Sequence, residues 1–285
     1  MNSTNMKFSY YFGSRERVMA REYDSLFEFL KTNGYEAVEL LEMYNGEQIF
    51  NSEAEVLEFA RLLKLNGIAS SCYSVYMDIY DKKIGSAEEY LKKQVDIASI
   101  LGSPYLHHTL KPELEKTSDL INTDDLLSVG MPILKSVADY AKSKGITLLY
   151  EPQGMYFNGA GLKKLIDTFA QMGVENVGVC ADFGNSMFVD YAPCEIISEM
   201  MQYVCHVHIK DYKLCPDGEG DYRSSGGQCF YEVEYAKGDM KNRECIEALL
   251  DAGYNGYFST ELNPRRVTAD DAGVDALKRI RKDFL

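Results

Sequence analysis

Three things are missing from this sequence of 285 residues, and each absence excludes a class of protein. No stretch approaches the roughly 20 apolar residues that a membrane-spanning helix needs. The start of the chain lacks the apolar centre of a signal peptide. No two of the seven cysteines form a CxxC pair, which disfavours zinc fingers. We therefore expect a cytoplasmic protein with reduced cysteines and no membrane partner.

Positive charge is also scarce. Lys and Arg number 30 against 44 Asp and Glu, which gives a formal net charge of -14. Such a surface repels polyphosphate at long range and lacks the basic footprint of nucleic-acid binders. We therefore expect no nucleic-acid partner, although a local positive site for a small anion is compatible with this charge.

What the sequence does contain is a strand and a helix that alternate along the whole chain. The expected strands are 7–12, 37–41, 68–75, 105–110, 146–151, 177–182, 203–212 and 256–262. The expected helices are 23–32, 53–65, 86–101, 123–144, 161–172, 193–201, 239–250 and 269–284. Ser52 and Ser86 begin capping boxes, and Asp239 is an expected N-cap.

Eight strand and helix pairs with near-continuous apolar strands predict a TIM barrel, which usually has about 250 residues. A doubly wound sheet is the alternative, but the sequence after the first strand, Gly13-Ser-Arg-Glu, is not a Gly-rich phosphate turn. We therefore predict a single (β/α)8 TIM-barrel domain over residues 1–285. The irregular, Gly-rich segment 213–237 would form a partial lid over the site.

The ends of four successive strands carry metal-ligand residue types, namely Glu151, Asp182, His208 and Glu261. In TIM barrels the active site forms at these carboxyl ends. Three carboxylates and one imidazole at one mouth would repel one another without a cation. This set suits one divalent metal ion such as Mn, Mg or Co, with Zn as a further option. His206 shares the face of His208, because strand side chains alternate.

Five motifs in order resemble those of the xylose isomerase-like barrel superfamily, specifically its sugar phosphate isomerase and epimerase family. They are Tyr150-Glu-Pro-Gln, Cys180-Ala-Asp-Phe-Gly-Asn, His206-Val-His-Ile-Lys-Asp, Lys237-Gly-Asp-Met and Ser259-Thr-Glu-Leu-Asn. The resemblance implies that Glu151, Asp182, His208 and Glu261 bind one metal ion. It also implies that Glu151 and Glu261 exchange protons with substrate carbons from opposite sides. His206 would be a hydrogen-bonded core residue one layer lower.

The chemistry supports such roles. Removing a poorly acidic C–H proton beside a carbonyl becomes feasible when a metal ion stabilises the enediolate, and two carboxylates can act as base and acid in turn. We therefore predict a metal-dependent isomerase or epimerase of a ketose, a related polyol ketone or its phosphate. An inosose-type dehydratase is the alternative. An abasic-site endonuclease-like or a non-catalytic sugar-binding protein fits less well. The sequence leaves the oligomeric state open, including a homo-oligomer.

Three further residues are candidate substrate contacts. Asn185 stands where many relatives carry histidine. Lys210 shares the face of His208 and would reach a substrate oxyanion or pair with a carboxylate. His107 and His108 have opposite parity, so one of them faces the barrel interior; the sequence does not decide which, and His108 is the candidate contact. The pair at 265–266, both arginines, is expected to be solvated surface charge.

Overall fold

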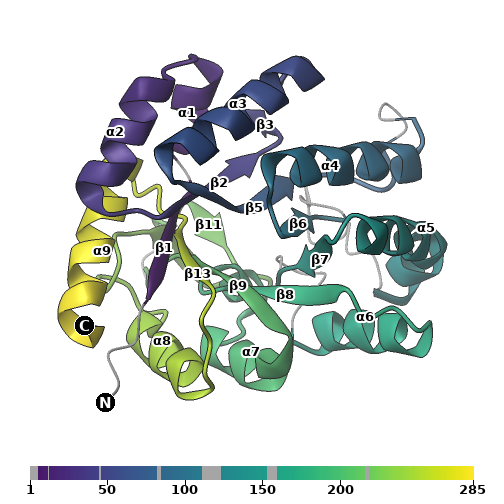
Figure 1. The fold of residues 1–285 in the computed structure, drawn as a ribbon. Coiled ribbons are helices and arrows are strands. Elements are labelled where there is room, and N and C mark those ends of the chain that lie inside the picture. Colours follow the sequence, from purple (N-terminus) through teal and green to yellow (C-terminus); the bar gives the residue numbers. More distant parts are fainter. Residues whose placement is uncertain are drawn as a thin grey trace.

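Eight parallel strands form a closed barrel surrounded by helices (Figure 1), as predicted. The computed structural model describes residues 6–11, 13–44, 46–81, 85–110, 123–152, 159–215 and 218–285. The order around the barrel is β1-β13-β9-β8-β7-β6-β5-β2. The barrel strands are β1 (Lys7–Tyr10), β2 (Ala37–Leu41), β5 (Ala69–Val75), β6 (Tyr105–His108), β7 (Thr147–Tyr150), β8 (Val177–Asp182), β9 (Val204–Ile209) and β13 (Tyr257–Thr260).

The short helix over residues 14–19 was not predicted, and the other helices begin and end close to the predicted positions. They are α1 (Ser14–Met19), α2 (Tyr23–Asn33), α3 (Glu53–Asn66), α4 (Ala87–Leu101), α5 (Thr123–Ser143), α6 (Gly159–Gln171), α7 (Pro193–Met200), α8 (Asn242–Asp251) and α9 (Ala269–Phe284). The side chains of Ser52 and Ser86 cap α3 and α4, as predicted, by accepting hydrogen bonds from backbone N–H groups three residues later. In the described part of the chain, no helix is long and apolar enough to cross a bilayer.

The predicted N-cap at Asp239 is wrong. Helix α8 begins at Asn242, after Lys241 in a left-handed conformation with φ 54°. The Asp239 carboxylate instead accepts hydrogen bonds from Lys213 Nζ at 2.7 Å and from the backbone N–H of Leu214 at 2.9 Å. The side chain therefore ties the segment before α8 to the strand that follows the barrel strand β9.

The predicted lid segment contains a small antiparallel sheet. Its strands β10 (Tyr212–Leu214), β11 (Tyr222–Arg223) and β12 (Cys229–Glu232) lie in the order β10-β12-β11. Phe230 and Tyr212 from this sheet form an apolar cluster with Met187 and Met240. Burial of this cluster gives the segment its own small core, which an expected Gly-rich loop would lack. A two-stranded hairpin, β3 (Met43–Tyr44) with β4 (Glu47–Gln48), also follows β2.

The interior of the barrel is unusually polar. Ser9, Glu39, His206 and Cys72 are all completely buried. Ser9 and Ser71 share a hydrogen bond of 2.6 Å between their hydroxyl groups. Apolar residues instead fill the layer between strands and helices, as an alternating strand pattern requires. The barrel thus separates an apolar outer core from a polar inner column that leads to the strand ends.

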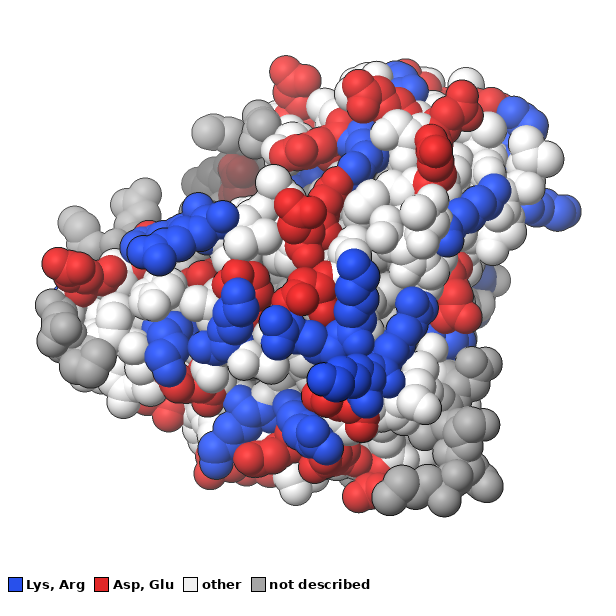
Figure 2. Space-filling view, turned by 90° about the vertical axis from the view of Figure 1, so that its left-hand side faces the viewer, with Lys and Arg blue, Asp and Glu red and all other residues white. Residues whose placement is uncertain are grey.

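Charges of both signs are interspersed on the outer surface. Figure 2, which faces the side of Figure 1 where α2 and α9 lie, shows Lys and Arg gathered among Asp and Glu. Arg17 forms an ion pair with Asp270 at the start of α9. Arg265 pairs with Asp221, and its guanidinium side chain remains half exposed. The 265–266 pair is therefore surface charge, as expected.

Candidate metal centre

The four predicted ligands meet at one end of the barrel. Glu151 follows β7, Asp182 ends β8, His208 lies in β9 and Glu261 follows β13. Parallel register places Asp182 beside His208 on the neighbouring strand. His208 Nδ1 lies 2.9 Å from Glu261 Oε2, 3.3 Å from Glu151 Oε2 and 3.6 Å from Asp182 Oδ2. One ligand atom from each residue lies within 4.8 Å of all the others.

The hydrogen-bonding of these atoms fits a divalent ion. Glu151 Oε2, Asp182 Oδ2, His208 Nδ1 and Glu261 Oε2 are buried and form no hydrogen bond with the described residues, although Asp182 Oδ2 is also in an ion pair with Lys210. Leaving such groups unpaired is costly, and a cation coordinated by all four would remove that cost. Three oxygen atoms and one nitrogen atom are ligands that Mg²⁺, Mn²⁺, Co²⁺ or Zn²⁺ accepts. The donor set therefore fits the implied metal ion.

A carboxylate that the sequence analysis missed supports the ligand histidine from below. Glu39 of β2 is completely buried. Its two oxygen atoms lie 3.0 Å from His208 Nε2 and 2.8 Å from His206 Nε2. A carboxylate accepting from Nε2–H leaves the Nδ1 lone pair of His208 directed at the metal position, as in carboxylate–histidine–metal arrangements. His206 is a buried, hydrogen-bonded residue one layer below His208, as predicted.

Electrostatic interactions between neighbouring groups favour the charged forms of Glu39 and His208. Burial alone would raise the pKa of Glu39, but His208 and His206 hold it well below its ordinary value. Burial alone would lower the pKa of His208, but the surrounding acidic groups, including Glu39 and Glu261, raise it well above its ordinary value. In the metal-free protein, a proton on His208 thus partly compensates the surrounding carboxylates.

The structure decides between the two adjacent histidines. His107 faces the interior, where its Nε2 lies 3.6 Å from Glu151 Oε1 and its Nδ1 lies 3.2 Å from Ser74 Oγ. His108 points outward and forms a hydrogen bond of 3.1 Å with the Tyr150 hydroxyl group in the layer beneath the helices. The predicted substrate contact through His108 is therefore wrong. The strand register, which pairs His107 with Ser74 and Leu149, sets this orientation.

Lys210 completes the centre on the β9 side. Its Nζ lies 2.9 Å from Glu261 Oε1, 3.2 Å from Asp182 Oδ2 and 3.1 Å from Asn185 Oδ1. Burial lowers the pKa of Lys210, but Asp182 and Glu261 outweigh it and raise that pKa well above its ordinary value. The ion-pair alternative for Lys210 is thus what the structure contains. Asn185 is positioned by its backbone N–H, which donates to Asp182 Oδ1 at 2.6 Å.

Two further residues near the mouth were not foreseen. The Tyr11 ring stacks on the His208 ring, with a centroid distance of 5.2 Å and an angle of 22°. Glu232 of β12 is buried and accepts a hydrogen bond from the backbone N–H of Asn263, two residues after Glu261. Burial is the main cause that raises the pKa of Glu232 to about 7. The small sheet therefore brings an additional carboxyl group next to the strand end that carries Glu261.

Comparison with known proteins agrees with this geometry. The sequence matches the family described as xylose isomerase-like TIM barrel over residues 27–282. The chain belongs to this family. The matched region covers nearly the whole chain, as the series of five motifs predicted. No curated protein matches the sequence.

Solved structures share the xylose isomerase-like fold at low identity. A xylose isomerase-like TIM barrel protein from Mycobacterium smegmatis in complex with magnesium has 17% identity and a TM-score of 0.75, covering 99% of this chain and 98% of its own. L-ribulose 3-epimerase has 14% identity and a TM-score of 0.72, with 98% and 94% covered. The probable 3-DHS dehydratase AsbF from Bacillus anthracis has 13% identity and a TM-score of 0.70, with 97% and 99% covered.

Proposed function

We propose that this protein is a divalent-metal-dependent isomerase or epimerase of a ketose, a related polyol ketone or its phosphate. One observation carries the proposal: four buried ligand atoms without hydrogen-bond partners among the described residues converge at the carboxyl ends of consecutive barrel strands. A metal ion held by Glu151, Asp182, His208 and Glu261 would supply Lewis-acid stabilisation of negative charge on the substrate oxygens. A solved epimerase and a magnesium complex with the same fold support this class.

The two glutamates have distinct surroundings at the centre. Strands β8 and β9 separate their strands in the barrel. Glu261 Oε1 lies against the Lys210 ammonium group at 2.9 Å, whereas Glu151 Oε1 lies 3.6 Å from His107. Burial lowers the pKa of His107 and so disfavours its charged form. We therefore assign proton removal and return to Glu151 and Glu261 on opposite faces of the substrate carbon.

Lys210 and Asn185 are the proposed substrate contacts. The Lys210 ammonium group and the Asn185 side chain are joined at the mouth by a hydrogen bond of 3.1 Å. Together they offer donors to a substrate hydroxyl, carbonyl or phosphate oxygen. The Tyr11 ring, stacked on His208, gives the same mouth an aromatic surface. These residues would orient the substrate so that its reacting carbon lies between the two glutamates.

A dehydratase is the second candidate. The specific observation in its favour is the buried Lys210 ammonium group, since such a group can donate a hydrogen bond to a departing hydroxyl group. Removal of the same C–H proton would then be followed by loss of water instead of return of a proton. The fold similarity to a probable dehydratase agrees with this candidate.

The test is hydrogen exchange in deuterated water. The protein, loaded with Mg²⁺ or Mn²⁺, is incubated with ketoses, inositol ketones and their phosphates, and products are followed by mass spectrometry and NMR. Deuterium beside the carbonyl in a product of unchanged carbon skeleton supports the isomerase or epimerase, while loss of water supports the dehydratase. Absence of exchange with every compound contradicts both.

Matched variants test whether Glu151 and Glu261 carry out the proton exchange. Glu151→Gln and Glu261→Gln should each lower the exchange rate by about 100-fold or more, the scale of general acid–base catalysis. Glu175→Gln is the control, because that side chain is 84% exposed and lies before the start of β8, at the end of the strand opposite Asp182. Unchanged exchange in both Glu151→Gln and Glu261→Gln would remove the proton-transfer assignment.

A further inference from the structure

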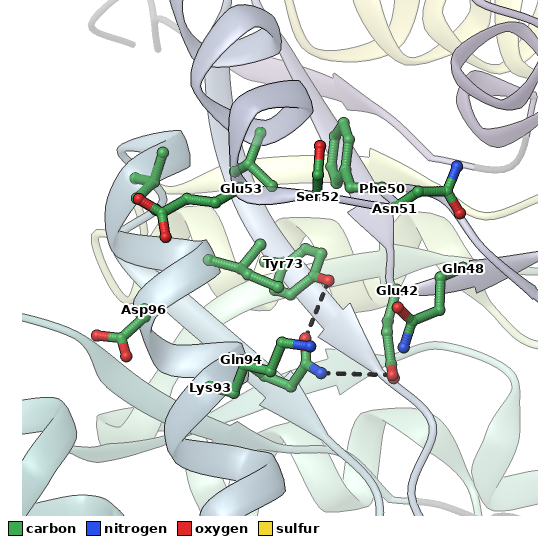
Figure 3. Close-up of a pocket in the computed structure, with 13 residues that line it drawn as sticks. Glu42, Gln48, Phe50, Asn51, Ser52, Glu53, Tyr73, Lys93, Gln94 and Asp96 are labelled. Carbon is green, nitrogen blue, oxygen red and sulfur yellow. Dashed lines mark hydrogen bonds between the residues drawn. The ribbon is translucent and has the colours of Figure 1, made fainter.

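A cavity lies outside the barrel, between the hairpin after β2, the start of α3 and the helix α4 (Figure 3). Its volume is about 170 Å³. A cavity of about 150 Å³ is large enough to hold benzene in an engineered protein, so a ligand with five or six heavy atoms fits here. Phe50, Val56, Ile97 and Ile100 provide apolar walls.

A buried carboxyl group lines the cavity at its polar end. Glu42 follows β2 and is only 3% exposed, yet its Oε2 has no hydrogen-bond partner within the described ranges. Gln94 Nε2 donates to Glu42 Oε1 over a long distance of 3.5 Å, and Tyr73 donates to Gln94 Oε1 at 3.1 Å. Figure 3 shows this chain of Tyr73, Gln94 and Glu42 side by side. One carboxylate oxygen atom therefore remains available to a ligand.

The backbone holds Glu42 firmly in this position. Its N–H donates to Ser74 O at 2.8 Å, and its carbonyl oxygen accepts from the N–H of Ile49 at 2.9 Å. These bonds link the strand ends of β2 and β5 and the hairpin. Because these backbone bonds keep the Glu42 side chain from turning toward water, its carboxyl group stays buried. The free-energy cost of that burial must be offset by groups inside the cavity.

The charges around the cavity favour a cation. The acidic residues Glu53 and Asp96 line it together with Glu42, against one basic residue, Lys93. Asp96 is already paired with Lys144 at 2.8 Å. In the part of the chain that the structure describes, no Lys or Arg forms an ion pair with Glu42, although Lys93 lies near enough to lower its pKa. An anion would face an unpaired carboxylate, whereas an ammonium group would complete its bonding.

We propose that this cavity binds a small primary ammonium ion, with the ammonium group on Glu42 and a short hydrocarbon body between Phe50, Ile97 and Ile100. The site is separate from the metal centre, because Glu42 and Tyr73 lie on the outer face of their strands. This proposal does not depend on the proposed function. Burial raises the pKa of Glu42 to about 7, so proton loss from Glu42 near neutral pH should accompany binding.

The test compares n-butylammonium with butan-1-ol, which has the same shape and no charge. The full chain, saturated with Mg²⁺ to occupy the metal centre, is titrated with each compound at pH 8 in 150 mM NaCl and followed by NMR. Butylammonium should bind at least tenfold more tightly than butan-1-ol. Equal affinities, or no binding of either compound, would overturn the proposal.

Two variants place the binding at Glu42. Glu42→Gln keeps the shape of the side chain and should weaken butylammonium binding at least tenfold, to the level of the alcohol. Glu53→Gln removes a charge from the exposed rim and should change the dissociation constant less than twofold. If butylammonium affinity is unchanged in Glu42→Gln, or falls equally in Glu53→Gln, the binding is a general attraction to surface charge. Either result would overturn the proposal.

If Glu42→Gln does not fold, butylammonium affinity measured over a pH series on the unmodified protein tests the same contact. The other charged groups that line the cavity are Lys93 and Asp96 on α4 and Glu53 on α3; the Lys93 charge lowers the pKa of Glu42, whereas Asp96 is paired with Lys144. Butylammonium keeps its charge between pH 5.5 and 8, so its affinity should fall at least tenfold at the lower pH as Glu42 takes up a proton. Constant affinity across this range would contradict the proposed contact.

Discussion

Replacing Glu39 by Gln tests how far the ligand histidine depends on the carboxylate beneath it. The Glu39 carboxylate accepts hydrogen bonds from both His206 and His208, at 2.8 and 3.0 Å. A glutamine has one accepting oxygen atom, so its amide N–H₂ must face one of the two Nε2 atoms. Where it faces His208, the ring must move its proton to Nδ1, and the lone pair directed at the metal ion is lost.

The expected loss of metal affinity follows from this change of one hydrogen bond. Removing an outer partner of a ligand histidine typically costs 10- to 100-fold in metal affinity, which corresponds to about 1.4 to 2.8 kcal/mol. A hydrogen bond to a charged group contributes about 1.5 to 3 kcal/mol, which agrees with that range. Isothermal titration of the metal-free protein with Mn²⁺ measures the change directly.

A neighbouring glutamate supplies the control. Glu42→Gln removes a buried carboxyl group three residues along the chain, outside the barrel interior, and should leave Mn²⁺ affinity within twofold. Circular dichroism shows whether each variant folds. A folded Glu39→Gln protein with the affinity of the unmodified chain would refute the proposed support of His208 by Glu39.

Four other substitutions have definite expected results. Lys210→Met leaves buried carboxylates unpaired, so it should lower the stability of the metal-free protein by about 3 kcal/mol in urea unfolding, with most of this loss recovered in saturating Mg²⁺. For Glu42, the folded pKa of about 7 exceeds the ordinary value of 4.5, so the folded state binds the proton more tightly. The stabilisation that Glu42 contributes is therefore fully present below pH 4.5 and is lost as the pH rises through 7, so Glu42→Gln should remove a pH-dependent loss of up to about 3 kcal/mol in unfolding measured from pH 4 to 8. His108→Gln should reduce thermal stability without changing Mn²⁺ affinity, whereas His107→Gln should reduce substrate turnover; the opposite result would contradict the observed orientation of the two rings.

The fold was predictable because each structural unit has local signals. Strands β2 and β8 have the predicted bounds, and the caps at Ser52 and Ser86 form as expected, since these features depend on neighbouring residues. The convergence of the four candidate ligands was also predictable, because the ends of parallel strands meet at one mouth whatever the packing outside. Their convergence required only the strand order of a barrel.

The remaining site residues depend on contacts between distant parts of the chain. A glutamate within the apolar run 37–41 signals a buried charge, but its partners in β9 lie 167 and 169 residues away. The orientation of His107 and His108 depends on the register of β6 against β5, which no local pattern sets. Asp239 satisfies a local cap pattern, yet tertiary hydrogen bonds to β10 hold it elsewhere. Glu232 reaches the mouth only because its segment folds into a sheet.

Two glutamates, one within β2 and one directly after it, show how side-chain parity separates two kinds of buried acid. Glu39 faces the interior, where two histidines hold its pKa well below the ordinary value and fix it as a charged acceptor. Glu42 faces the helix layer, where burial without an ion pair in the described chain raises its pKa to about 7. The same residue type thus supports the candidate ligand His208 on one face of the strand and leaves a carboxylate oxygen without a hydrogen bond in the described chain on the other. Burial alone therefore does not identify a functional carboxylate, because the partners that compensate its charge decide its role.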